Sequence, residues 1–183
     1  GPTVVTMPHV FEELFAASGS RLADHLSLRP LDPSCRHFFP DGSRLDLFND
    51  REASREAIRV FAGTRAAEGF DAFCDHAARI YEFVRGTFME QAAPTSVLGM
   101  LHPKNLVMLP ALLRIDSGRT LWRALGDFFP DERLRVLFAR YATYNGSSPM
   151  HAPGTLAVIA HGEQAFGVHA VEGGIRRLAE ALA

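Results

Sequence analysis

The most regular pattern of apolar and polar positions lies in the middle of the chain, from residue 64 to about 91. Apolar residues recur there every three or four positions, with acidic and basic residues between them. This spacing places the apolar side chains on one face of an α-helix. The pattern predicts a long amphipathic helix with a core face formed by Ala66, Phe70, Phe73, Ala77, Ile80, Val84 and Phe88.

Capping residues indicate further helices in the same part of the chain. Asn49 or Asp50 can cap a helix before the long one, and Ser117 and Asp131 can cap two helices after it. The helix that starts at Asp131 should end at Gly146, because glycine readily adopts the left-handed backbone that terminates helices. These signals predict a mainly helical middle region.

The patterns of β-strands lie near the two ends of the chain. We expect strands at 3–6, 26–31, 36–39, 44–48 and 164–171. The third and fourth flank Pro40-Asp41-Gly42-Ser43, a turn in which proline fixes φ and glycine accepts a positive φ, so they should form a hairpin. The fold class is therefore α+β, with a mixed, largely antiparallel sheet of about five strands packed against a helical layer.

The order of these elements divides the chain into three parts. Residues 1–48 are β-rich and include a first helix capped by Thr6. Residues 49–150 form a helical subdomain. Residues 151–183 hold a short helix from 153 to about 162, a return strand and a truncated last helix opened by the glycine pair Gly173-Gly174.

Residues 97–113 are the most apolar segment of the sequence. Pro103, Lys104 and Pro110 interrupt the segment, and it is shorter than the roughly 20 apolar residues that a membrane-spanning helix needs. Two interpretations remain: a core helix, or a surface that dips into a bilayer or lines an apolar tunnel. We expect a cytoplasmic location, with a peripheral position on the inner membrane as the further option.

Composition and motif spacing exclude several kinds of function. A net charge of −2 provides no general field for nucleic acid. The two cysteines, Cys35 and Cys74, have no metal-ligand spacing, and neither HExxH nor CxxC occurs, so we expect no metal site. The sequence also contains no GxSxG, GxGxxG or Walker motif.

Four segments, taken in order, carry a resemblance to a known family. They are Gly1-Pro-Thr-Val-Val-Thr-Met-Pro8, the hairpin from Phe38 to Phe48, Arg140-Tyr-Ala-Thr-Tyr144 with Gly146-Ser-Ser-Pro149, and Gly167-Val-His-Ala-Val-Glu-Gly-Gly174. Together they resemble the carotenoid desaturases of the phytoene desaturase type over nearly the whole chain, although Ile175 stands where methionine is more usual. The third and fourth segments are most similar to the bacterial branch that acts on hydroxy- or methoxyneurosporene.

The resemblance implies the substrate-domain portion of an FAD-dependent enzyme with an amine-oxidase-like fold. In that family an acyclic carotenoid gives a hydride to the flavin, and proton loss then completes a new C=C bond. The family's dinucleotide fingerprint and carboxy-terminal flavin segment have no counterpart here. We therefore expect an excised fragment, with Gly1 just after the first flavin segment and Ala183 inside a helix, that binds no FAD by itself and is inactive alone.

The resemblance also implies roles for particular residues. The residues expected near the FAD of the parent enzyme are Pro2, Thr3, Gly173 and Gly174. The residues expected near the carotenoid, in a dry and elongated apolar slot, are Arg140, Tyr141, Tyr144 and His169.

Each of these roles has a plainer alternative. The glycine pair can serve close packing of a helix on a sheet, and His169 can be an ordinary strand residue. One of Tyr141 and Tyr144 is expected to be structural, because two buried hydroxyls would both need partners. Arg140 can face solvent or a carboxylate from another domain.

Two other functions remain open on the sequence alone. One is a different FAD-dependent enzyme of the amine-oxidase superfamily, which would have carboxylates or an aromatic cage in its pocket. The other is a non-enzymatic module that binds an apolar ligand in a closed cavity.

Overall fold

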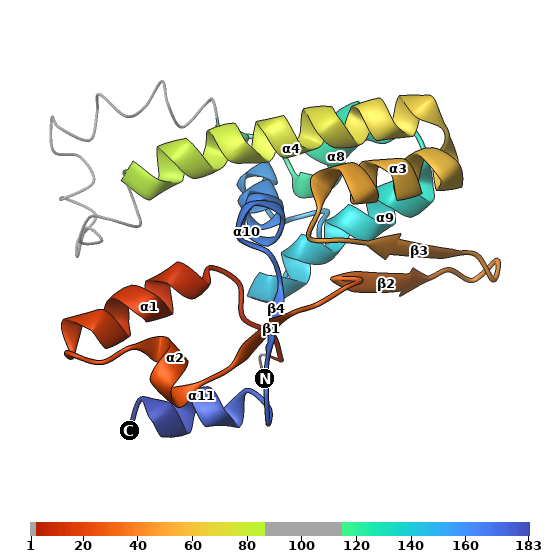
Figure 1. Ribbon diagram of the computed structural model, residues 1–183. Helices are drawn as coiled ribbons and strands as arrows, with labels where there is room; N and C mark the ends of the chain where they lie inside the picture. The colour runs from red at the N-terminus through yellow and green to blue at the C-terminus, as the bar shows by residue number, and fades with distance from the viewer. Residues whose placement is uncertain (1–2, 87–114) are drawn as a thin grey trace, which may run out of the picture. The chain divides into compact units, whose positions relative to one another are not determined.

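The computed structural model describes residues 3–86 and 115–183, which form two compact units (Figure 1). Unit 1 consists of Gly1–Phe61 and Gly162–Ala183, and unit 2 consists of Ala62–His161. Helix α10 (Val158–Phe166) carries the chain from unit 2 back to unit 1. Pro2 and the apolar segment 97–113 lie outside the described residues.

Unit 1 contains two small antiparallel sheets instead of the expected sheet of about five strands. Strand β1 (Leu28–Pro30) pairs with β4 (His169–Val171), and β2 (Cys35–Phe38) pairs with β3 (Arg44–Leu47). The β2–β3 pair confirms the predicted hairpin.

Two expected strands account for the difference. The segment 3–6 contributes one isolated bridge, in which Val5 and His169 exchange two backbone hydrogen bonds of 2.8 Å. Met7 then turns the chain with a φ of 55°. The expected strand 164–171 begins at His169, because α10 continues to Phe166 and Gly167 follows with a φ of 73°. The prediction of one five-stranded sheet is therefore wrong for the described residues.

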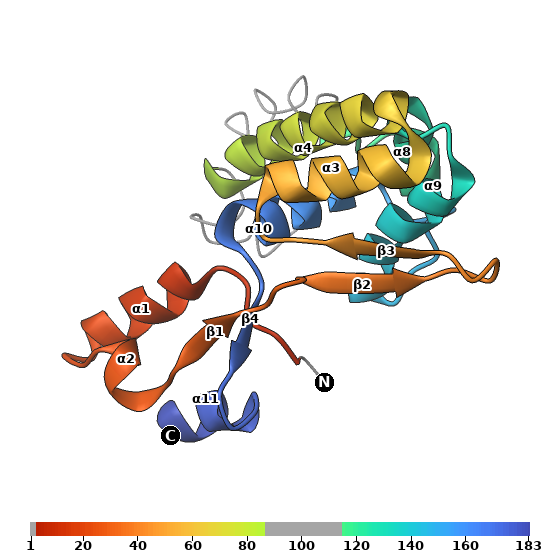
Figure 2. The same cartoon turned by 45° about the vertical axis from the view of Figure 1, so that its right-hand side comes forward.

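Four helices complete unit 1: α1 (Pro8–Ala17), α2 (Leu22–His25), α3 (Arg51–Ala62) and α11 (Arg176–Ala181). Helices α1, α2 and α11 gather around the β1–β4 pair (Figure 2). Their shared core is small and consists of Val5, Phe15, Leu22, Leu26 and Val171, with partly buried residues of α1 and α11 packed on it.

The helix starts in unit 1 agree only in part with the sequence. Pro8 lies in the first turn of α1 as expected, but the N-cap position belongs to Met7 and not to Thr6. At α3 the carboxylate of Asp50 accepts a 2.7 Å hydrogen bond from the backbone N–H of Ala53, so Asp50 is the capping residue. Asn49 has a different role, which is described below.

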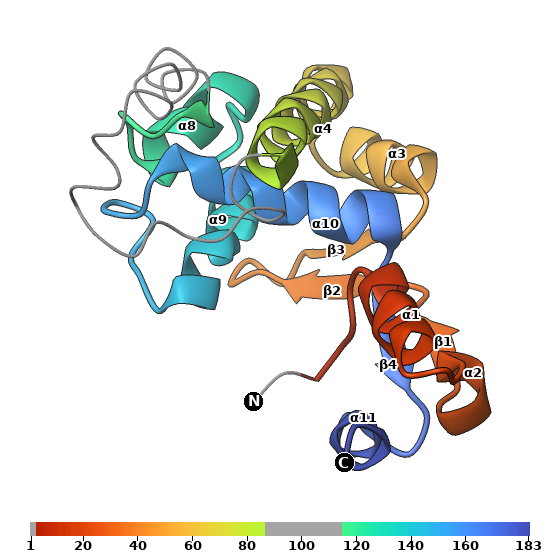
Figure 3. The same ribbon diagram turned by 90° about the vertical axis from the view of Figure 1, so that its left-hand side faces the viewer.

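Unit 2 is built on α4 (Thr64–Val84), the long helix that the apolar pattern predicts. It packs beside α8 (Leu121–Phe128), which in turn packs beside α9 (Glu132–Ala139), and the three helices lie together in all views (Figure 3). The predicted core face is confirmed for five residues that are at most 1% exposed: Ala66, Phe70, Phe73, Ala77 and Ile80. Val84 is only partly buried, and Phe88 lies outside the described residues.

Stacked phenylalanines fill the space between the three helices. The ring centroids of Phe129 and Phe138 are 4.6 Å apart, and those of Phe73 and Phe138 are 5.1 Å apart. At one point the helices approach so closely that a side chain is excluded. A Cβ added to Gly69 of α4 would lie 2.0 Å from the carbonyl oxygen of Phe128.

Of the two N-cap residues predicted in unit 2, one is correct and one is wrong. Asp131 caps α9 by accepting a 2.8 Å hydrogen bond from the backbone N–H of Arg133, as predicted. The cap of α8 is Thr120 and not Ser117. Helices α8 and α9 also meet through a cation–π contact, in which the guanidinium of Arg135 from α9 lies 5.1 Å from the ring centre of Trp122 in α8.

The chain leaves α9 through two 3₁₀ helices. The first, η3 (Arg140–Asn145), ends at Gly146, whose φ of 63° confirms the predicted stop. The second, η4 (Gly154–Ala157), leads into α10, so the short helix expected from residue 153 onward is partly 3₁₀ and extends beyond residue 162.

Candidate functional site

Three of the predicted site residues lie along one strand and the turn that follows it in unit 1. His169 begins β4, and its backbone pairs with Val5, two residues after the exposed Thr3. Gly173 and Gly174 follow β4 after one intervening residue, Glu172. Thr3, His169 and the glycine pair thus share one local structure, the β4 strand with its bridge and its turn.

The glycine pair forms an exposed tight turn. The backbone N–H of Gly174 donates a 2.9 Å hydrogen bond to the carbonyl oxygen of Val171, and the φ values are 78° at Gly173 and 92° at Gly174. Residues other than glycine rarely adopt these values. A Cβ at Gly174 would meet nothing within 4 Å, whereas one at Gly173 would lie 3.3 Å from Cγ of Arg177, so the turn presents bare backbone at Gly174 only. The pair does not open α11 directly, because Ile175 is the N-cap of this six-residue helix.

The side chain of His169 occupies a confined place at the start of β4. A Cβ added to Gly167 would lie 3.2 Å from the Cε1 atom of His169. The Nδ1 atom of His169 is buried and has no hydrogen-bond partner among the described residues.

The other predicted substrate residues lie in η3 of unit 2. The ring of Tyr141 is 1% exposed and belongs to the aromatic core, 6.4 Å from Phe138 between ring centres. Tyr144 is 57% exposed, and the guanidinium of Arg140 lies 4.6 Å from the centre of the Tyr141 ring. Tyr141 therefore has the position of a structural residue, whereas Tyr144 is accessible. The predicted site residues form two groups, one in each unit.

A polar network in unit 2 was not anticipated from the sequence. The Nε2 atom of His76 lies 2.7 Å from the carboxylate of Asp116, which also pairs with the guanidinium of Arg119 at 2.7 and 3.0 Å. Arg119 also contacts Asp127. His76 and Asp116 lie 40 positions apart in the sequence, so no local spacing indicates that they pair.

Burial and charge act in opposite directions on Asp116. Desolvation by burial raises the pKa of its carboxyl group, but the hydrogen bonds and charge of Arg119 and the nearby His76 outweigh this effect, so its pKa lies below the ordinary value. Asp116 has a φ of 57°, and a Cβ added to Gly154 would lie 2.8 Å from its Cβ. Because its pKa is lowered, the carboxyl group of Asp116 stays ionised. It pairs with His76 of α4 and with Arg119 just before α8, so its role is to hold these two segments together.

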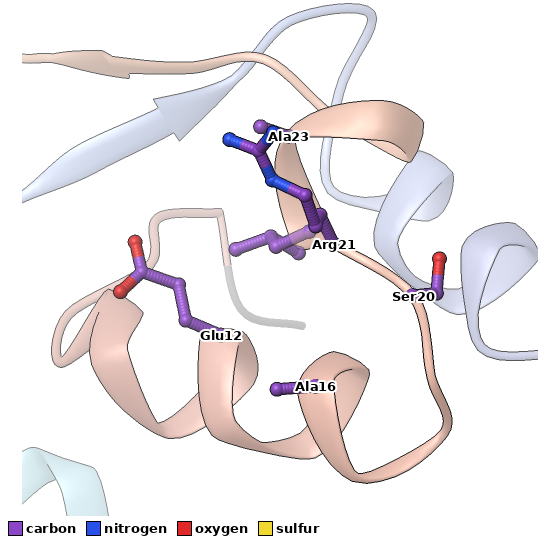
Figure 4. Close-up of a pocket in the computed structure, with 6 residues that line it drawn as sticks. Glu12, Ala16, Ser20, Arg21 and Ala23 are labelled. Atoms are coloured by element: carbon purple, nitrogen blue, oxygen red, sulfur yellow. The ribbon is translucent and has the colours of Figure 1, made fainter.

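A pocket of about 250 Å³ lies between α1 and α2 of unit 1 (Figure 4). Glu12 projects from α1 and Arg21 from the side of α2, and the remaining lining residues are Ala16, Ser20, Leu22 and Ala23. Typical ligand pockets have volumes of roughly 300–1,000 Å³ and mainly apolar walls. This pocket does not match the elongated apolar slot expected for a carotenoid.

Within residues 3–86 and 115–183, no group of three or more His, Cys, Asp or Glu side chains could hold a metal ion. The helices in these ranges are also too short or too polar to cross a membrane. Neither observation extends to the apolar segment 97–113.

Comparison with known proteins shows similarity along all 183 residues. The chain is 44% identical to a hydroxyneurosporene desaturase from Rubrivivax gelatinosus and 47% identical to one from Cereibacter sphaeroides, covering 34% and 36% of those proteins. It is 38% identical to a phytoene dehydrogenase from Streptomyces griseus, of which it covers 35%. The whole chain is aligned in each case. No protein-family model matches it.

The chain thus spans about a third of the length of the curated relatives it matches. These relatives are all named as enzymes that introduce double bonds into carotenoids or remove hydrogen from them. The predicted resemblance is confirmed. By sequence, the whole chain is similar to about a third of each of these carotenoid desaturases.

Proposed function

We propose that this chain is the substrate-side part of an FAD-dependent desaturase that acts on an acyclic carotenoid of the hydroxy- or methoxyneurosporene type. The observation that carries the proposal is the identity of 42–47% to three proteins named hydroxyneurosporene desaturase. Identity falls to 28–29% for relatives named as oxygenases of diapocarotenoids. The gradient favours desaturation over oxygenation.

The turn after β4 fits a contact with a flavin. Both glycines are exposed, and the space beside Gly174 is open, so a planar ring can approach the backbone there, whereas the side chain of Arg177 lies beside Gly173. We propose that this turn and the exposed Thr3 face the ring, together with Pro2. Because the sequence has no GxGxxG motif, we assign no phosphate contact to these residues. When bound, FAD would supply the acceptor for the hydride that leaves the carotenoid.

The chain's own residues would bind and orient the polyene. The half-buried His169 starts the strand that leads to the glycine turn, and we assign it to a place near a polar end group of the carotenoid. In unit 2, we assign the exposed ring of Tyr144 to contact with the polyene. We assign the guanidinium of Arg140 to an oxygen of the carotenoid's polar end group. Tyr141 would support both from the aromatic core.

The remaining proposals concern the surroundings of the enzyme. We propose a cytoplasmic protein with peripheral membrane contact through residues 97–113. This location would suit an apolar substrate, since a carotenoid dissolves in the bilayer and would enter the enzyme from it.

The test uses the complete product of the gene that encodes this chain. Incubated with FAD and hydroxy- or methoxyneurosporene in lipid vesicles, it should give a product that has lost H₂ and absorbs at longer wavelength. The 183 residues alone, with the same additions, should give no product. Turnover of an amine but not a carotenoid by the complete protein would contradict the proposal, and so would desaturation by the 183 residues alone.

A further inference from the structure

One side chain in unit 1 connects three segments that are far apart in the sequence. Asn49 follows β3, and its Oδ1 atom accepts a 2.8 Å hydrogen bond from the backbone N–H of Val168, just before β4. Its Nδ2 group donates to the carbonyl oxygen of Leu31, just after β1, at 3.2 Å and to that of Val168 at 3.3 Å. The side chain therefore ties the end of β3 to the β1–β4 sheet.

The three hydrogen bonds need one acceptor and one donor group at position 49, which an amide side chain supplies. Oδ1 meets a donor, whereas Nδ2 meets two carbonyl oxygens, which fixes the orientation of the group. An aspartate could accept from Val168 but would place a charge against two carbonyl oxygens. An alanine would leave all three backbone groups without these partners.

The local backbone is shaped around this amide. Gly167 has a φ of 73°, and a Cβ there would lie 3.4 Å from Cγ of Asn49 and 3.2 Å from Cε1 of His169. Glycine thus allows the amide and the imidazole to approach the same point of the backbone. The ring of His169 is confined next to the group that anchors its strand.

The strand that Asn49 holds is short and has few backbone partners. The β1–β4 sheet pairs three residues of each strand, and isolated two-stranded sheets are marginally stable. Leu31 also donates a 2.9 Å backbone hydrogen bond to Val168, and Glu172 donates one of 3.0 Å to Ser27 at the other end. On the other side of β4, Val5 and His169 exchange two backbone hydrogen bonds of 2.8 Å. The three contacts of Asn49 are the side-chain hydrogen bonds that add to these backbone pairs at the start of β4.

We propose that Asn49 is a positioning residue for desaturation, which acts through β4 on His169 and on the Gly173-Gly174 turn. The inference rests on the proposed function, in which that turn faces the flavin. Asn49 does not touch the reacting atoms. Its amide sets where β4 begins, and the turn follows β4 after one residue, so the amide sets the geometry of hydride transfer and not the affinity for carotenoid.

The test compares Asn49→Ala with Ser54→Ala in the complete gene product. Ser54 is a suitable control because its hydroxyl exchanges hydrogen bonds of 2.8 and 3.0 Å with the backbone of Phe48, next to Asn49, but makes no contact with Val168. Both variants lose hydrogen bonds in the same region, and only one of them releases β4.

Two quantities are measured. Hydrogen–deuterium exchange of residues 167–174 should become about tenfold faster in Asn49→Ala, because the Val168 N–H loses its acceptor. Desaturation should show a kcat about 10–100-fold lower with KM within about twofold, since a small misplacement of reacting groups slows chemistry strongly. Ser54→Ala should change neither quantity by more than about twofold. Asn49→Asp keeps an acceptor for the Val168 N–H but places a charge against the carbonyl oxygens of Leu31 and Val168, so it should lower kcat while the Val168 N–H exchanges more slowly than in Asn49→Ala.

The outcomes separate the inference from the proposed function. Unchanged exchange in Asn49→Ala, faster exchange with unchanged kcat, or equal losses in Asn49→Ala and Ser54→Ala would each overturn the positioning role. If the unmodified protein desaturates no carotenoid, the proposed function fails and the role in turnover fails with it. The exchange data alone then decide whether Asn49 fixes β4.

Discussion

The two units of the molecule are held together in different ways. In unit 2, three helices meet across stacked aromatic rings, and the side chains on the inner face of α4 are almost completely buried. In unit 1, the core cluster around the β1–β4 pair is small, although Leu45, Leu47 and Ile58 are also buried. The two sheets have two strands each, and side chains such as Asn49 and Ser54 bond to backbone groups of other segments.

This difference shows which kind of interaction fixes each part of the proposed site. Non-directional burial of aromatic rings positions η3 with Arg140 and Tyr144. Directional hydrogen bonds position β4 with His169 and the glycine turn. Substitutions should therefore affect unit 2 through lost volume or new clashes, and unit 1 through lost donors and acceptors.

The largest expected effect breaks the aromatic core of unit 2. Phe138→Ala removes a ring that is 1% exposed and stacks on Phe129, so the free energy of unfolding should fall by about 3–5 kcal/mol. Denaturant titration of the variant measures this loss. Val136→Ala, in the same helix but 55% exposed, serves as the control and should stay within about 0.5 kcal/mol. Similar losses in both variants would mean that α9 is not held by packing.

A smaller effect is expected from adding one methyl group between two helices. Gly69→Ala places a Cβ 2.0 Å from the Phe128 carbonyl oxygen, so α4 and α8 must separate at a cost of about 1–3 kcal/mol. The control is Gly162→Ala in α10, where a Cβ meets nothing within 4 Å and where alanine should stabilise by about 0.5–1 kcal/mol. Thermal unfolding distinguishes the two directions. A stabilised Gly69→Ala would show that the helices do not approach as closely as described.

The smallest effect sharpens the comparison by using the same interaction in both units. Asp50 caps α3 in unit 1 and Asp131 caps α9 in unit 2, with hydrogen bonds of 2.7 and 2.8 Å to backbone N–H groups. Replacing either by alanine should cost about 1 kcal/mol. The loss can be measured by calorimetry for each variant. A loss several times larger for Asp50 would indicate that the cooperativity of unit 1 depends on each polar contact more than that of unit 2.

The helices that the sequence predicts well are those whose pattern repeats over several turns. The buried face of α4 follows from its apolar spacing, and the β2–β3 hairpin follows from its Pro-Asp-Gly turn. Helix α2 has four residues, too few for any periodicity to show. The expected single sheet failed because α10 extends through residues whose weak alternation also fits a strand.

The arrangement of the site was less accessible to sequence reasoning, because it depends on long-range contacts. Asn49 reads as a helix cap, whereas its partners lie 18 and 119 positions away. The two tyrosines of η3 illustrate the same limit. The sequence indicates that one of them is structural, but the packing of α4 against α9 decides that it is Tyr141.

The position of Trp122 has a practical consequence for following the two units. It is the single tryptophan of the chain, and the three tyrosines, Tyr81, Tyr141 and Tyr144, also lie between Ala62 and His161. Intrinsic fluorescence of this chain therefore originates in unit 2 and is sensitive to the Arg135 guanidinium that covers the indole. A fluorescent side chain introduced into unit 1, for example by Phe39→Trp beside Phe61, would give that unit its own optical signal.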